Sequence, residues 1–249
     1  MVKNRCFHNF RHLTSTSTFR IFIILDILLA IYACIFITNQ LSYSESVITV
    51  FSFPYCNMML ISLIFIIVCE TIRLFKGNQF QLIRFLNKEE MFISMLKQVI
   101  FNVSIAFLFH LLFMFIGFNL FHFNELGFNL VVNGINIIIY NLFLIVRMYL
   151  YLIIISVINS LLLYILDLKF ILGINIIILI MIPQYYFYFP TISVDSTNLI
   201  PIFISGFFTQ TYFSNFSIEL CSSVGYFFIL MIFSYLLYYL LLKYNNRVV

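Results

Sequence analysis

Three ionisable side chains stand inside long apolar stretches of this sequence: Asp26, His110 and Arg147. An ionisable group in the hydrocarbon layer of a membrane is costly, so each is a candidate polar point in a path through the bilayer. Each also has a structural interpretation. Asp26 follows Arg20 by about 9 Å of helix rise and can lie near the inner interface. Arg147 can extend to the outer headgroups, and a neutral His110 can hydrogen-bond a neighbouring helix.

Other reactive residues give no recognisable catalytic pattern. A cysteine nucleophile needs a nearby histidine base, but Cys34 and His110 belong to different apolar stretches that nothing in the sequence brings together. The chain contains no HExxH, GxSxG or phosphate-binding GxxxxGK[ST] motif. Its five cysteines are odd in number and lack CxxC spacing, which predicts neither a disulfide framework nor a metal site.

The composition is that of a polytopic membrane protein. The chain is 63% hydrophobic and 9% charged, with a mean hydropathy of +1.10. Crossing the hydrocarbon layer takes about 20 apolar residues per helix. We predict an all-α membrane protein in which residues 1–249 form a single transmembrane domain. Its six predicted spans are residues 19–38, 50–72, 98–121, 143–166, 170–189 and 220–242.

The basic residues predict the orientation of these spans. Every lysine and arginine except Arg147 falls before or at the start of the first span, between the second and third, between the fourth and fifth, or after the sixth. The other loops carry Glu45, Glu125, Asp195 and Glu219 and no basic residue. Because cytoplasmic loops are enriched in Lys and Arg, both termini are predicted to be cytoplasmic. The net charge of +4 follows from these loops and does not indicate nucleic-acid binding.

The larger inner loop, residues 73–97, predicts a short amphipathic helix outside the membrane. One face of this helix is apolar, with Phe80, Ile83 and Leu86. The charged residues off that face or following it are Arg84, Lys88, Glu89 and Glu90. Such a helix can rest on anionic lipid or dock into a groove of a partner protein. The two glutamates favour docking, because attraction to anionic lipid does not explain them.

Two further segments have distinctive patterns. Residues 200–208 are apolar but only about half a span long, which predicts a re-entrant segment between the fifth and sixth spans. Residues 122–142 are polar for this chain and longer than a tight turn requires, so they are predicted to extend the third and fourth spans outside the membrane.

The layout resembles the membrane subunit of an ABC-2 type transporter. Those permeases have six helices, cytoplasmic ends, a coupling helix between helices two and three, and a re-entrant segment between helices five and six. They also carry an acidic residue ending helix two, a nearby glycine, and a lysine opening helix three. Glu70, Gly77 and Lys97 match these positions, with residues 79–87 as the coupling helix. The family's proline and Ser-Arg pair before that lysine are absent here.

The resemblance implies a permease that acts with a separate ATPase, which would bind ATP and magnesium, and with a second permease subunit, commonly as a homodimer. Size and composition are most similar to exporters of amphipathic or antimicrobial peptides in the cell membrane of low-GC Gram-positive bacteria. No cofactor is expected in this chain, which is not predicted to be an enzyme by itself. A bacteriocin or lantibiotic immunity protein without transport and an intramembrane peptide-processing enzyme remain alternatives.

Overall fold

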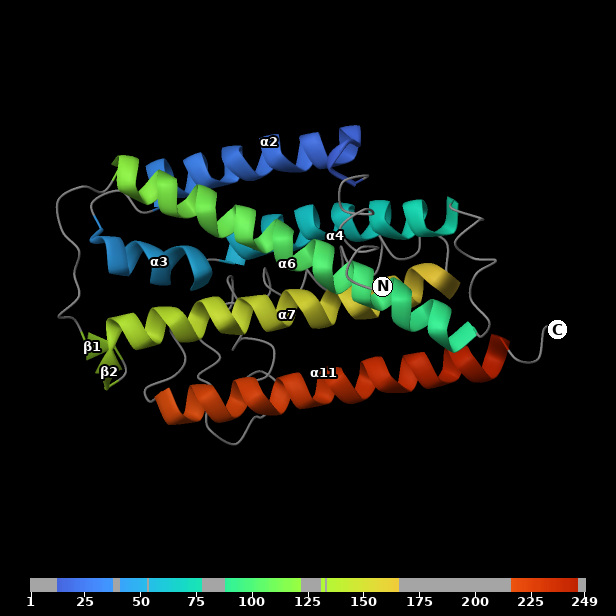
Figure 1. The fold of residues 1–249 in the computed structure, drawn as a ribbon. Helices are drawn as coiled ribbons and strands as arrows, with labels where there is room; N and C mark the ends of the chain where they lie inside the picture. The colour runs from blue at the N-terminus through green and yellow to red at the C-terminus, as the bar shows by residue number, and fades with distance from the viewer. Residues whose placement is uncertain are drawn as a thin grey trace.

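The computed structural model describes residues 13–37, 41–52, 54–77, 88–121, 131–132, 134–165 and 216–245, and these are almost entirely helical. Figure 1 shows long helices lying side by side as an elongated bundle. The all-α class predicted from the sequence is therefore confirmed for the described residues. The predicted fifth span, residues 170–189, the re-entrant segment and most of the amphipathic helix lie outside them.

The first long helix, α2, spans Ser17–Tyr32 and continues as a π-helical turn, η1, over Ala33–Ile37. The side chain of Thr16 caps α2 by accepting a hydrogen bond from the amide of Phe19 at 3.2 Å. This cap satisfies one of the amides that a helix start leaves without a partner. Together α2 and η1 correspond to the predicted first span.

The predicted second span, residues 50–72, is wrong at its start because two helices meet there. Helix α3 spans Tyr43–Ser52 and α4 spans Pro54–Gly77. Ser42 and Glu45 form a capping box at the start of α3, with Glu45 Oε2 accepting from the Ser42 hydroxyl at 2.7 Å and from its amide at 3.0 Å. The proline explains the break: a residue before proline avoids helical geometry, whereas proline itself suits the first turn of a helix.

The third and fourth predicted spans belong to helices longer than expected. Helix α6 spans Lys88–Phe121 and α7 spans Ile137–Ile165. Before α7, β1 (Val131–Val132) and β2 (Ile135–Asn136) form a two-stranded antiparallel hairpin. Gly134 in its turn has a φ of 83°, which favours glycine. Helix α7 thus begins before residue 143, which agrees with an extension of the fourth span. Residues 122–130 are not described.

The last helix, α11, spans Phe216–Asn245. Figure 1 shows α4, α7 and α11 running in one direction and α2 and α6 running in the other. Helices α7 and α11 are therefore parallel, and α7 ends at the opposite end of the bundle from the start of α11. The exposed basic residues Arg73, Lys76 and Lys243 lie toward the end where α4, α7 and α11 finish.

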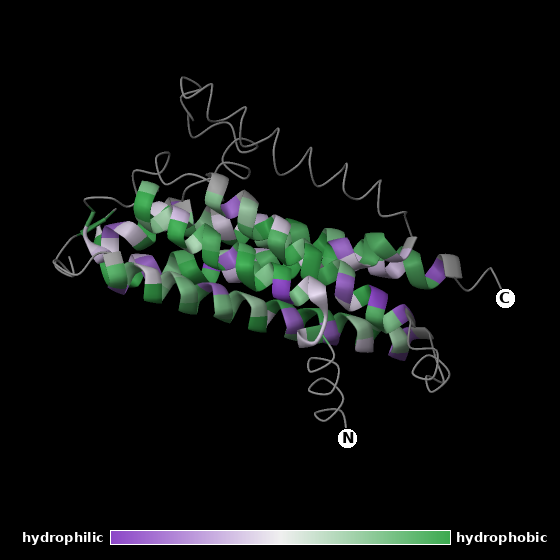
Figure 2. Cartoon of the chain, turned by 90° about the horizontal axis from the view of Figure 1, so that it is seen from above, coloured by the Kyte–Doolittle hydropathy of each residue, from purple (hydrophilic) through white to green (hydrophobic). Residues whose placement is uncertain are grey.

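Helix α4 lies at the centre of the bundle and contacts α2, α3, α6 and α7. Its apolar residues Ile64 and Ile67 pack in one core with Val99 and Val103 of α6, and all are at most 1% exposed. The outer faces of α2, α6, α7 and α11 instead expose large apolar side chains. Figure 2 shows hydrophobic residues along most of the length of the helices, as expected where a bundle faces lipid.

Four described helical segments are long and apolar enough to cross a membrane: Ser17–Phe36, Glu89–Leu120, Ile137–Tyr164 and Glu219–Lys243. By length and composition, they are helices of a membrane protein. Helix α4 carries Glu70, Arg73 and Lys76 in its second half.

Candidate functional site

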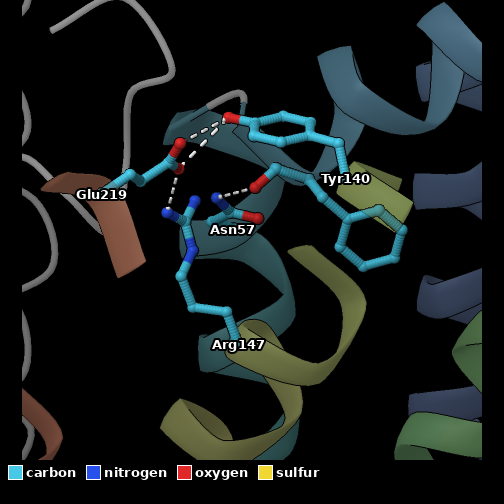
Figure 3. A network of polar contacts seen from close by, with 5 residues as sticks. Asn57, Tyr140, Arg147 and Glu219 are labelled. Atoms are coloured by element: carbon cyan, nitrogen blue, oxygen red, sulfur yellow. Dashed lines mark hydrogen bonds and ion pairs between the residues drawn. The ribbon is translucent and has the colours of Figure 1, made fainter. Parts of the chain in front are cut away.

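The best-defined polar site joins the start of α11 to α7. Glu219 in the first turn of α11 is fully buried and pairs with Arg147, with 2.7 Å between its Oε1 and the Nη1 of the guanidinium. The hydroxyl of Tyr140 lies 3.1 Å from Oε1 and 2.9 Å from Oε2 of the same carboxylate. Figure 3 shows both α7 side chains converging on Glu219. Charge-assisted bonds of this kind are stronger than those between neutral groups.

The second branch of the Arg147 guanidinium has a different environment. Its Nη2 is buried and has no hydrogen-bond acceptor among the described residues. The Cζ atom lies 5.4 Å from the centre of the Phe143 ring, one turn earlier on α7, which is within the range of a cation–π contact. In the same view, Asn57 of α4 donates to the carbonyl of Phe51 at 2.9 Å, where α3 meets α4.

Two expectations about these residues are wrong. Arg147 does not extend to the outer headgroups, because its side chain is 3% exposed and turned toward Glu219. Glu219 does not stand in a loop, because it lies in the first turn of a helix that begins at Phe216. The pairing explains why Arg147 is the exception to the distribution of basic residues: a buried charge persists where an opposite charge compensates it.

A second buried pair joins α2 to α6. Asp26 Oδ1 and His110 Nδ1 are 2.7 Å apart, and the two side chains are 0% and 3% exposed. Phe51 meets the imidazole edge-on at 6.3 Å, and Phe107 stacks on it at 6.4 Å. Asp26 is therefore buried inside the bundle, and its position relative to the inner interface stays a prediction. The expected bond of His110 to a neighbouring helix is confirmed. The second oxygen of Asp26, Oδ2, has no partner among the described residues.

The structure separates the three ionisable residues into two sites. Asp26 and His110 belong to the contact between α2 and α6, whereas Arg147 belongs to the contact between α7 and α11. Sequence reasoning missed Glu219 as the partner of Arg147 and Tyr140 as a donor. Glu219 directly precedes the predicted sixth span, and an acidic residue at that position was a signal that could have indicated a partner for Arg147.

A third polar group links α4 to α6. The side chain of Asn102 donates to the Thr71 hydroxyl at 2.9 Å and accepts from Gln98 at 3.2 Å. Asn102 thus bridges two helices, whereas the amide of Asn119 donates to the carbonyl of Phe115 in its own helix.

The residues predicted to contact an ATPase are only partly described. Phe80, Ile83, Arg84 and Leu86 lie outside the described residues. Helix α6 begins at Lys88, and Glu89 and Glu90 are exposed in its first turn. These three residues are therefore not loop residues, and the helix containing the third span starts ten residues earlier than the predicted residue 98.

The residues that carried the family resemblance lie at the same end of the bundle. Glu70 is 5% exposed and lies 3.4 Å from the largely exposed guanidinium of Arg73. Gly77 is the last residue of α4, and Lys97 is exposed on α6. Nearby, the Lys76 ammonium donates to the carbonyl of Leu163 in the last turn of α7 at 3.3 Å. A cation there complements the negative end of the helix dipole.

Within the described residues, no group of three or more His, Cys, Asp or Glu side chains is placed to hold a metal ion. Among the described residues, the cysteines Cys34, Cys56, Cys69 and Cys221 form no disulfide. Comparisons of the chain with protein-family models, curated proteins and solved structures find no match. The described site is thus a pair of buried charge contacts between membrane helices.

Proposed function

We propose that the chain is the membrane subunit of an ABC-2 type exporter, driven by a separate ATPase and moving amphipathic or antimicrobial peptides out of the cell or the membrane. In this proposal, two such subunits act together, commonly as a homodimer, in the cell membrane of a Gram-positive bacterium. The ATPase contributes ATP and magnesium. The proposal rests on the topology and on the residues that follow α4.

The observation that carries the proposal is the position of the end of α4 and the start of α6. Helix α4 ends at Gly77 and α6 begins at Lys88, and Figure 1 shows both ends at the side of the bundle where α7 and α11 finish. This side carries exposed basic residues, which is typical of the cytoplasmic face. Residues 78–87 therefore connect two helix ends on the basic side of the bundle, the side that a cytoplasmic ATPase would contact.

Helix α6 supports coupling between an ATPase and the membrane helices, because it is continuous from the end of this segment into the middle of the bundle. From Lys88 to His110 the helix rises about 33 Å without a break. His110 then bonds Asp26 of α2, and Gly117 lies against Cys34 in η1. A displacement of the start of α6 is therefore transmitted along the helix to α2. An ATP-driven exporter requires a mechanical connection of this kind.

The parallel course of α7 and α11 supports the six-span topology. The chain leaves α7 at one end of the bundle and enters α11 at the other. The fifth span was predicted in this interval, between residues 165 and 216, and a span there would join the two ends. In a six-span arrangement α2 would begin and α11 would end on the basic side, as in the family that the sequence resembles.

The first test is affinity purification of the tagged protein from its own host in mild detergent, followed by mass spectrometry. A stoichiometric soluble ATPase is the expected result. Its absence from a folded, abundant preparation would overturn the proposal.

A pair of matched variants then tests the docking surface. Phe80→Asp with Ile83→Asp places charge on the predicted apolar face and should abolish association with the ATPase. Asn78→Asp with Gln81→Asp adds the same charge off that face and should retain it. Equal association of the two variants would refute docking through this face, provided that both reach the membrane in equal amounts.

A further inference from the structure

The buried guanidinium of Arg147 has an unused hydrogen-bonding branch. Glu219 accepts a hydrogen bond only from Nη1, although the planar guanidinium of an arginine can donate to acceptors through both of its branches. Nη2 has no acceptor among the described residues, and the side chain is 3% exposed. A buried charged donor without a partner is strongly unfavourable. In native structures such a group commonly marks a water or ligand site.

The charge of the site decides what kind of acceptor it favours. The positive charge of Arg147 and the negative charge of Glu219 cancel, and the hydroxyl of Tyr140 adds none. An additional anion would leave a net negative charge in an apolar region, where an uncompensated charge is strongly disfavoured. A neutral carbonyl oxygen satisfies Nη2 without adding charge.

The side chains of the site are buried, whereas most of α11 is exposed. Only 6% of the residues in the apolar window of α11 are buried, against 39% in each of the other three candidate spans. In the described part of the chain, α11 packs chiefly on α7. Arg147 and Glu219 thus lie in the contact, or seam, between α7 and the first turns of α11, and the ring of Phe143 is an apolar surface on the α7 side.

We propose that Nη2 of Arg147 binds a backbone carbonyl oxygen of an amphipathic peptide at the seam between α7 and α11. This inference rests on the proposed export function and names the chemistry by which the peptide is recognised. A helical peptide is a suitable ligand because its last four carbonyls lack partners within the helix. These carbonyls are neutral acceptors at the negative end of a helix dipole.

The binding test uses purified protein in nanodiscs of ester lipids. The probe is a fluorescent Leu/Lys amphipathic helical peptide, acetylated and amidated so that it has no terminal charge. Arg147→Lys keeps a cation for Glu219 but loses the second branch, and should weaken peptide binding about tenfold. Arg73→Lys, at a side chain that is 77% exposed, is the matched control and should leave binding unchanged. Equal affinities for wild type and Arg147→Lys would overturn the proposal.

The acceptor itself is identified by NMR of protein with ¹⁵N-labelled arginine, with the Arg147 signals assigned from Arg147→Lys. Addition of the peptide should shift the Nη signal of Arg147 in ester-lipid and ether-lipid nanodiscs alike. A signal that changes between the two lipids and ignores the peptide would identify a lipid carbonyl as the acceptor. A signal that responds to neither would identify a resident water. Either result would overturn the proposal.

Failure of this inference is distinguishable from failure of the proposed function. If the ATPase copurifies but peptide binding does not depend on Arg147, the site is refuted and the export function stands. If no ATPase copurifies but peptide binding depends on Arg147, the export function is refuted and the peptide site stands.

Discussion

Replacement of Arg147 by leucine removes the cation that compensates Glu219. The carboxylate is then left fully buried with Tyr140 as its remaining partner. Breaking a buried ion pair by removing one partner costs about 3–5 kcal/mol, because an uncompensated charge stays behind. The free energy of unfolding of Arg147→Leu should therefore fall by about that amount.

The double variant Arg147→Leu with Glu219→Leu provides the decisive comparison. Replacing both members of a buried pair by apolar residues is often neutral or stabilising by about 1–4 kcal/mol. We therefore expect the double variant to recover the stability that the single variant loses. A third variant, Tyr140→Phe, keeps the ion pair and removes one hydrogen bond, and should lose about 0.5–1.5 kcal/mol.

The assay is unfolding of the purified proteins in mixed micelles of increasing SDS content, followed by circular dichroism. All variants should be compared at equal protein and lipid concentrations. A single variant as stable as wild type, or a double variant as unstable as the single one, would refute the reasoning. Recovered stability without recovered peptide binding in the double variant would further show that the pair is retained for recognition and not for folding.

Three further predictions concern packing and helix ends. Gly117→Ala places a methyl group 2.6 Å from the Cys34 sulfur and should cost about 1–3 kcal/mol in the same assay, and adding Cys34→Ala should restore most of it. Hydrogen bonds from the Ser42 hydroxyl and amide hold the pKa of Glu45 below its usual range. The capping contribution should therefore be present above the unfolded pKa and disappear as the pH falls through the folded value, and pH-dependent stability should lose this component in Glu45→Gln. Lys76→Met removes the cation at the end of α7 and should lower stability by about 0.3–1 kcal/mol, less so at high salt.

Hydropathy predicted the helical class well because apolar length is a local property of the sequence. The first, third, fourth and sixth predicted spans all fall largely within described helices. The junction at Pro54 was missed because apolar residues continue across it, although proline itself marks the boundary. The start of α6 was also missed, because hydropathy detects the apolar part of a helix and not its charged first turns.

The polar contacts were harder to predict because they join residues distant in sequence. His110 and Asp26 are separated by 84 positions, and Arg147 and Glu219 by 72. The sequence marked Asp26, His110 and Arg147 as unusual, but their pairing depends on which helices are neighbours and on how each is rotated. Extension of Arg147 to the headgroups, one of its two interpretations, needs no partner, whereas the structure provides one.

Glu219 follows Arg147 by 72 positions, so the ribosome makes Arg147 well before it makes the partner of that residue. A ribosome completes α7 long before it reaches α11, so the newly inserted α7 carries its arginine into the membrane while the compensating carboxylate does not yet exist. On translocon scales an unpaired arginine costs roughly 2.5–3.5 kcal/mol at the centre of a membrane helix. Assembly is therefore finished by the last helix, and a nascent chain stopped before Glu219 presents a membrane-embedded positive charge that cellular quality control can recognise.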